Sequence, residues 1–210
     1  MASERAEEGD PAGGRRGYHH GNLREALLEA AEALIVEVGP DGFTLADACR
    51  RAGVSTAAPY RHFEDRNALL EAVCMRGFDA LAEATGAAKC SHPLGTVEHI
   101  LESGRGYVAF ALEQPERFRL MFGRKPDIKG RPQVERTGRA CFQHLLESVS
   151  AYLGEQGRAG EDPLPIALRL WAVVHGVASL AIDGPLDIIA PGCDPATVVD
   201  AAGRAILDGA

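Results

Sequence analysis

Side chains that could bind the phosphates or base edges of a nucleic acid gather between positions 44 and 66 of this 210-residue chain. The hydroxyls of Ser55 and Thr56 can donate to phosphate oxygens or base edges, and the methyl of Ala57 can contact a thymine methyl. Further donors surround them at a spacing that suits a clamp on two backbone strands: Thr44, Tyr60, Arg61, His62 and Arg66. These residue types predict recognition of a duplex by hydrogen bonds and charge.

Two short helices joined by a tight turn would hold these side chains in place. Thr44 is suited to cap the first helix, and Gly53 can take the positive φ that the turn requires. Val54 would fill the space between the helices, and Ser55 would cap the second one. Pro59 lies in that helix, but within the first turn its missing amide would cost little. The sequence therefore predicts a helix-turn-helix, whose second helix enters the major groove.

Charge is distributed unevenly along the chain, whose formal net charge is −8 from 22 basic and 30 acidic side chains. An acidic stretch over residues 1–14 precedes a basic stretch over 15–24, which contains Arg15 and Arg16. These two arginines either belong to a flexible tail or reach an adjacent minor groove as a basic arm. Because the positive charge is local, overall acidity would lower non-specific binding and leave specificity to the helix-turn-helix.

Helical signals continue through the rest of the chain, where apolar residues recur at three- and four-residue steps and prolines, glycines and capping side chains mark the ends. The predicted helices cover residues 23–38, 45–51, 55–62, 66–83, 93–112, 115–122, a long segment after the loop 123–132, 163–183 and 195–208. No alternating strand pattern occurs, so the predicted fold class is all-α. We expect an acidic tail and basic arm over 1–17, a three-helix DNA-binding domain over 18–65 and a larger helical domain over 66–210.

Three runs in the first third of the chain carry a family resemblance: residues 18–31, 42–48 and 52–70. The second half of the helix-turn-helix, with Val54-Ser55 and then Tyr60-Arg61-His62-Phe63, is its most specific part. Over residues 18–81 the chain resembles the DNA-binding domain of the TetR family of bacterial transcriptional regulators. Two positions depart from the usual pattern, namely Pro59 inside the recognition helix and Arg66, where the family often has lysine.

The resemblance implies a homodimer that places two helix-turn-helix heads on one palindromic DNA operator. It also implies a helical body that binds a small-molecule effector. A second, weaker match is the segment 170–176, Leu-Trp-Ala-Val-Val-His-Gly, which is similar to the Trp…His-Gly signature of one subgroup with a WHG-type C-terminal domain.

Aromatic and imidazole side chains in the body could line an effector pocket between its central helices. The candidates are Tyr107, Phe110, Phe118, Met121, Phe122, Phe142, His144, Trp171 and His175. An aromatic stripe at helical spacing can equally be packed core, so both interpretations stay open. For the dimer interface we expect the helices 163–183 and 195–208, with the contact residues Trp171, Val174, Ala178, Ile182, Val198, Val199, Ala202 and Ile206.

Several classes of protein find no support in the sequence. The sequence contains no zinc-hydrolase motif, no serine nucleophile elbow and no phosphate-binding loop, so we expect neither an enzyme nor a cofactor nor a metal site. The five cysteines suggest no disulfide framework. The apolar stretch 170–182 is too short to span a bilayer and is expected to be a buried core helix. The acidic N-terminus lacks a signal core, which favours a cytoplasmic protein.

The leading hypothesis is a ligand-responsive transcriptional regulator, most simply a repressor that an effector releases from DNA. One alternative keeps the DNA-binding dimer but denies small-molecule control, leaving regulation to abundance or a protein partner. Another is an enzyme on a helical scaffold, for which His144 and His175 would be the residues to replace.

Overall fold

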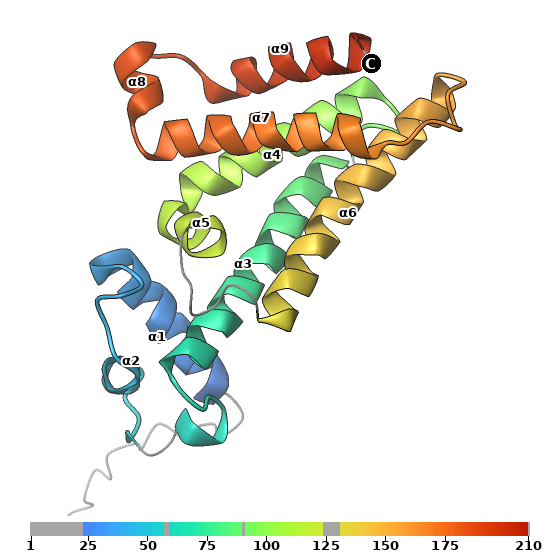
Figure 1. The fold of residues 1–210 in the computed structure, drawn as a ribbon. Coiled ribbons are helices and arrows are strands. Elements are labelled where there is room, and N and C mark those ends of the chain that lie inside the picture. Colours follow the sequence, from blue (N-terminus) through green and yellow to red (C-terminus); the bar gives the residue numbers. More distant parts are fainter. Residues whose placement is uncertain (1–22, 57–58, 90, 124–130, 210) are drawn as a thin grey trace, which may run out of the picture.

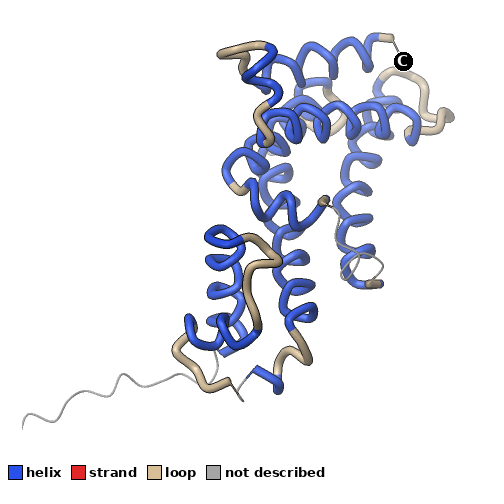
Figure 2. The backbone as a smooth tube through the Cα atoms, turned by 60° about the vertical axis from the view of Figure 1, so that its left-hand side comes forward, coloured by secondary structure: helices blue, strands red, loops and turns tan. Residues whose placement is uncertain are grey.

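The structure, a computed structural model, describes residues 23–56, 59–89, 91–123 and 131–209, and within them it contains helices and no strand (Figures 1 and 2). The α-helices are α1 (Leu23–Val38), α2 (Leu45–Arg51), α3 (Arg66–Lys89), α4 (Val97–Glu113), α5 (Pro115–Phe122), α6 (Pro132–Glu155), α7 (Leu164–Ile182), α8 (Pro185–Ile189) and α9 (Pro195–Asp208), with a 3-10 turn, η1, at Pro59–Arg61. The predicted all-α fold class, with an N-terminal helix-turn-helix domain and a helical C-terminal domain, is confirmed.

The 24-residue helix α3 links the two ends of the molecule (Figure 1). Its first half packs on α1, and its second half runs beside α4 and α6. At the far end, α7 and α9 lie side by side across α4. Below, "head" denotes residues 23–65 and "body" denotes the described residues from α4 to α9.

Local signals fix the head as the sequence predicts. Thr44 caps α2 in a capping box with Asp47. Gly53 has a φ of +69°, the left-handed conformation that glycine adopts without strain. Val54 packs against the core between the helices. These residues set the angle at which the chain leaves α2.

The segment after the turn differs from the prediction. Neither Ser55 nor Thr56 is helical, and the described part of the expected helix over 55–62 is only the 3-10 turn η1. Pro59 explains the difference, because its ring disfavours the α conformation for the residue before it and it lacks an amide. We were wrong to expect that a regular α-helix beginning at Ser55 would tolerate this proline.

Two helix boundaries after the head and one further helix also differ from the prediction. Helix α3 continues to Lys89 rather than ending near residue 83, and α4 begins at Val97 because Thr96 caps it and accepts from the backbone N–H of His99. The short helix α8 was not expected, since Gly184-Pro185 in the sequence indicates only the end of a helix.

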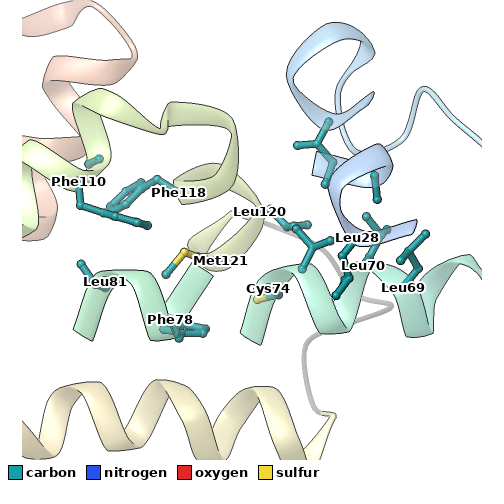
Figure 3. Close-up of a cluster of buried hydrophobic side chains, with 14 of the residues drawn as sticks. Leu28, Leu69, Leu70, Cys74, Phe78, Leu81, Phe110, Phe118, Leu120 and Met121 are labelled. Carbon is teal, nitrogen blue, oxygen red and sulfur yellow. The ribbon is translucent and has the colours of Figure 1, made fainter. Parts of the chain in front are cut away.

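One apolar core joins the head to the body (Figure 3). Leu28 of α1 packs near Leu69 and Leu70 of α3, and the same cluster continues through Leu120 of α5 to Phe118. A second cluster fills the far end of the body, where α4, α6, α7 and α9 meet, with members Ile100, Val149, Tyr152, Leu153, Ile166, Ala167, Leu170 and Leu207. The head is therefore not an independently packed unit.

Helix α7 is less buried than the sequence suggested. It has 19 residues and is, by length and composition alone, the one helix of the described chain that could cross a membrane. Only 33% of its apolar window is buried within the protomer. The expectation of a short, fully buried core helix over 170–182 is therefore wrong, and α7 presents an apolar surface that the protomer does not cover.

Candidate DNA-binding head and ligand cavity

The Thr44 hydroxyl caps α2 and is hydrogen-bonded to Asp47. It donates to Oδ2 of Asp47 at 2.6 Å, and its oxygen accepts from the backbone N–H of Asp47 at 3.2 Å. The first of these hydrogen bonds lowers the pKa of Asp47. A phosphate contact by this hydroxyl would have to compete with the Asp47 carboxylate.

The exposed edge of the head around η1 carries the side chains best placed for a polyanion. Ser55, Thr56, Arg61 and His62 are all exposed. No hydrogen bond or ion pair holds Arg61 among the described residues, so its guanidinium can turn to a phosphate. Arg50 also points to solvent, although it lies 3.2 Å from Asp47.

Arg66 takes a different role from the one expected. Its guanidinium donates to the backbone carbonyl of Pro40 and lies over the ring of Phe43, with 5.2 Å from its central carbon to the ring centroid. The Asp41 carboxylate is 3.5 Å away. This side chain holds the loop between α1 and α2, because burying its charge without these partners would be costly. A phosphate contact by Arg66 stays a prediction.

Three further predicted DNA contacts, Arg15, Arg16 and Ala57, lie outside the described residues. Tyr60 falls within η1, and its side chain also lies outside what the structure describes. Of the ten predicted DNA contacts, the structure thus brings Ser55, Thr56, Arg61 and His62 together on one exposed edge and turns Thr44 and Arg66 toward the protein.

A cavity of about 680 Å³ opens in the body between α3, α4, α6, α7 and α9. Five of the nine predicted pocket residues line it, namely Tyr107, Phe122, Phe142, His144 and Trp171. The structure places the others elsewhere. Phe110, Phe118 and Met121 are buried in the core, and His175 lies behind Tyr107. Helical spacing predicts that these side chains face inward. It does not predict which of them have neighbours that fill the space around them and which line a cavity.

Tyr107 forms the polar floor of the cavity, and His175 lies behind it. The Tyr107 hydroxyl lies 3.0 Å from Nδ1 of His175. Burial raises the pKa of Tyr107, and a hydrogen bond from Trp171 partly offsets that rise. Burial also lowers the pKa of His175, so its imidazole is neutral near pH 7 and can accept from the phenol.

Charged side chains reach the cavity only at its mouth, as far as the described lining residues show. Arg139 is exposed and 3.7 Å from Glu135, and His144 is exposed and 3.7 Å from Glu147. Trp171, the single tryptophan of the chain, is 36% exposed at the same opening.

Three glycines also line the cavity: Gly104, Gly138 and Gly203. A Cβ on Gly203 would come within 2.5 Å of Leu101, and one on Gly104 within 3.0 Å of Val199, so α4 and α9 pack closely there. A Cβ on Gly138 would lie 3.3 Å from the Phe78 ring. None of these glycines was singled out in the sequence.

The predicted dimer contacts divide into two groups. Ala178 and Val199 are 0% and 2% exposed, so they are core residues of the protomer and cannot contact a partner. Trp171 stands at the cavity mouth, and Val174, Ile182, Val198, Ala202 and Ile206 are half-buried. The half-buried residues stay predicted contacts, and further candidates on the same two helices are the exposed Ala172, Leu180, Ala201 and Ala205, with Gly176, where an added Cβ would meet open space. Most of these residues are alanine or glycine, whose side chains are too small to indicate an apolar face in the sequence.

Charged side chains join three helices where the head meets the body. Arg76 of α3 pairs with Glu25 of α1 and lies 3.6 Å from Glu32 of the same helix. Arg117 of α5 lies 3.0 Å from Glu32. We call these four residues the junction. Sequence reasoning missed it, because the only signal was an excess of acids on α1 without a partner in the neighbouring sequence.

Comparison with protein-family models gives two matches. Residues 100–205 match a model described as tetracyclin repressor-like, C-terminal domain, and residues 27–73 match a model described as bacterial regulatory proteins, tetR family. The first match alone covers half of the chain.

Two curated relatives share part of the sequence. The class A tetracycline repressor protein from transposon 1721 of Escherichia coli is 32% identical over 127 residues, which cover 58% of this chain and 53% of the repressor. The HTH-type transcriptional regulator BetI of Serratia proteamaculans (strain 568) is 41% identical over 61 residues, 29% of this chain and 31% of BetI. The chain thus spans about half or less of these relatives.

Two solved structures have the same fold over most of their length. A protein of unknown function from Rhodococcus sp. RHA1 is 36% identical with a TM-score of 0.78, covering 92% of this chain and 98% of that one. The TetR family transcriptional regulator PfmR from Thermus thermophilus has a TM-score of 0.61 and 19% identity, with coverage of 87% and 97%, which supports the fold alone.

Proposed function

The chain belongs to the TetR family of bacterial regulatory proteins, and on that premise we propose that it is a cytoplasmic transcriptional repressor which binds a palindromic operator as a homodimer and leaves it when a small molecule binds. The observation that carries this proposal is the combination, in one chain, of a helix-turn-helix head with a cavity of about 680 Å³ in the body. Neither catalysis nor a cofactor is part of the proposal.

The DNA-binding domain, assigned here to residues 18–65, would bind DNA through the exposed edge of the head. Thr56 and Ser55 would read base edges, while Arg61 and His62 would contact phosphates on either side. Arg15, Arg16, Thr44, Ala57, Tyr60 and Arg66 remain proposed contacts from the sequence. The negative charge of the rest of the chain would keep binding to unrelated DNA weak.

The C-terminal domain, assigned here to residues 66–210 and made up of α3 and the body, would dimerise through the outward faces of α7 and α9. Ala172 and Gly176 on α7 and Ala201 on α9 are small enough for two helices to approach closely. A second copy related by a two-fold axis would cover the apolar surface of α7 with the same surface of its own.

Helix α5 offers a physical link between the cavity and the head. On one side, Phe122 lines the cavity and contacts the His175 ring, with centroids 5.0 Å apart. On another side, Arg117 pairs with Glu32 of α1. A ligand that displaces Phe122 would therefore shift α5 against α1 and change the spacing of the two heads.

We also propose membership of the subgroup with the Trp…His-Gly signature. Trp171 stands at the cavity mouth and His175 supports Tyr107 at the floor, so both signature side chains meet the proposed effector site. Gly176, the third signature residue, falls on the outward face of α7.

The second candidate function is a DNA-binding dimer without small-molecule control. A well-packed, dry body would favour it, whereas the size and apolar lining of the cavity speak for a ligand. We therefore keep ligand control in the proposal.

The deciding experiment is selection of bound DNA from a random-sequence pool by the purified full chain at roughly physiological salt. A palindrome with half-sites one helical turn apart, or a multiple of it, would support the dimeric repressor. Enrichment of no sequence, from protein that mass spectrometry shows to carry no small molecule, would overturn the proposal. The selected operator then gives a fluorescent probe for release by added ligands.

A further inference from the structure

The cavity has two chemically different ends. Aromatic side chains from three helices meet at the end formed by the first core cluster, namely Phe78, Tyr107 and Phe122, and Phe142 with Trp171 of α7 stands between this end and the other. The opposite end is aliphatic and belongs to the second core cluster, with Ile100, Leu145, Leu146 and Leu170. A molecule that fills this space must match a ring at one end and a hydrocarbon chain at the other.

Hydroxyl and thiol hydrogens along the cavity are already used by the protein. Thr85 donates to the Leu81 carbonyl at 3.0 Å, Ser103 to the His99 carbonyl at 3.1 Å, Ser148 to the His144 carbonyl at 2.8 Å and Cys141 to the Phe78 carbonyl at 3.3 Å. The Tyr107 hydroxyl also has a partner inside the protein, Nδ1 of His175 at 3.0 Å, and the tautomer of the imidazole decides which of the two donates. The four donating groups therefore offer a ligand lone pairs but no hydrogens.

Charge is absent from the interior that the described lining residues form, since Arg139 and His144 stand at the mouth beside acids of their own helix. A carboxylate would meet no cation in this interior, and its burial without a charged partner would be strongly unfavourable. An ammonium group would find lone pairs and aromatic faces but no carboxylate, so its burial would also be unpaired.

We propose that the cavity binds a neutral amphiphile, a hydroxyl-bearing ring with an alkyl substituent. The ring lies against Phe122 and Trp171, its hydroxyl forms a hydrogen bond with the hydroxyl of Tyr107, and the alkyl group fills the aliphatic end. This inference rests on the proposed function insofar as it takes the cavity as the effector site. It adds the chemical class of the effector and the residue that selects it.

Four probes on one frame test the class: 4-hexylphenol, hexylbenzene, 4-hexylbenzoate and (4-hexylbenzyl)trimethylammonium. Because Trp171 is the single tryptophan and stands at the mouth, its fluorescence reports occupancy of the cavity without DNA. The phenol should bind about tenfold more tightly than hexylbenzene, since it adds one hydrogen bond. The benzoate and the ammonium compound should bind about 100-fold more weakly than the phenol.

Two variants assign the site. Tyr107→Phe should weaken 4-hexylphenol about tenfold and leave hexylbenzene unchanged, because it removes one oxygen and little volume. Leu168→Phe enlarges a leucine at the mouth that is 44% exposed, and it should weaken all four probes. The matched control is Leu112→Phe, an equally exposed leucine (46%) outside the cavity, which should change none of them.

The inference is overturned if the benzoate or the ammonium compound binds as tightly as the phenol, if no probe changes the fluorescence, or if Tyr107→Phe leaves the phenol's affinity intact. Failure of the proposed function looks different. In that case the phenol would bind with the expected preference, yet it would not release the selected operator.

Discussion

The head and the body present opposite chemistry to their surroundings. The edge of the head carries hydroxyl, imidazole and guanidinium groups, and Arg51, Arg66 and Arg76 hold its helices and loops through carboxylates and a carbonyl. The body keeps its hydroxyls bonded inward and exposes apolar side chains along α7, such as Leu164, Leu168 and Leu180. The head is thus suited to a polyanion, and the body to apolar partners, namely a ligand and a second copy.

This difference bears on how the two ends communicate. The junction consists of partly buried ion pairs, whose side chains are 21% to 37% exposed and whose geometry depends on charge. The rings of Phe118, Phe122 and His175 beside the cavity are close-packed, so they are sensitive to the shape of a bound molecule. Because α5 has one side in each region, a change of shape in the cavity can be converted into a change of charge contacts at α1.

Phe118→Ala would test whether head and body fold as one unit. Phe118 is 2% exposed in the core that both regions share, so its truncation should lower the free energy of unfolding by about 3–5 kcal/mol. Urea unfolding of the parent and the variant should each show one transition, followed by circular dichroism at equal protein concentration. Two separated transitions would break the shared-core picture, and the exposed change Leu112→Ala serves as the control.

Gly176→Arg would break the apolar partner of the body while leaving the protomer folded. A Cβ at Gly176 meets nothing within 4 Å, so the cost falls on the proposed dimer face, where two buried charges would meet. We expect a monomer by light scattering and a loss of operator affinity of about 100-fold, because the two half-sites are no longer bound together. The control is Gly154→Arg on α6, which is equally open in the protomer. A dimeric Gly176→Arg protein would contradict the assigned face.

Arg61→Ala would sharpen the assignment of charge in the head. The variant should bind the operator about tenfold more weakly, and the slope of log affinity against log salt should fall by about one. Arg51→Ala is the matched control, because Arg51 pairs with Glu37 at 2.6 Å and should leave the slope unchanged. Ligand binding to the body should show no comparable salt dependence, and equal slopes for both variants would remove Arg61 from the interface.

Arg117→Ala would uncouple the two regions. It removes the ion pair to Glu32, whose two side chains are only 22% and 21% exposed, and Arg76 stays 3.6 Å from Glu32, so the free energy of unfolding should fall by about 1–3 kcal/mol. The factor by which 4-hexylphenol lowers operator affinity should fall about fivefold, whereas affinity without ligand should hardly change. Fluorescence anisotropy with labelled operator gives both numbers. An unchanged factor would show that the signal travels by another route.

The smallest expected effect is a pH dependence of stability that His175 contributes. Burial lowers the pKa of His175, so the unfolded chain takes up the proton first as the pH falls. The stabilisation is present above the unfolded pKa of about 6.5 and is lost as the pH drops toward the folded pKa. The free energy of unfolding should thus fall less between about pH 7 and pH 5 in His175→Gln than in the parent, with His62→Gln on the exposed edge as control. Parallel curves for parent and His175→Gln would refute this contribution.

Sequence patterns predicted those parts of the fold that local chemistry decides. The cap at Thr44, the positive φ at Gly53 and the start of α9 after Asp194 each depend on a residue and its near neighbours, and each was confirmed. The prediction of an α-helix beginning at Ser55 was wrong for a local reason as well, because a proline such as Pro59 disfavours the α conformation for the residue before it.

The sites were harder to predict because they depend on contacts between distant segments. Arg66 has a suitable charge and position for phosphate, but the fold brings Pro40 and Phe43 within its reach. Val199 and Ala205 both belong to α9, yet only the neighbours of α9 decide that Val199 is core and Ala205 is surface. Periodicity finds an apolar face, whereas burial depends on which helix covers it.

The glycines that line the cavity bear on how the protein can evolve. Glycine and alanine codons differ by one base, so a single point mutation can narrow the cavity by a methyl group. At Gly203 and Gly104 that methyl would press Leu101 or Val199 and disturb the packing of α4 on α9. At Gly138 it would meet only the edge of the Phe78 ring at 3.3 Å, which needs a shift of a few tenths of an ångström. If the cavity binds the proposed effector, a change at one codon of α6 would alter the range of effectors without disturbing the packing of α4 on α9.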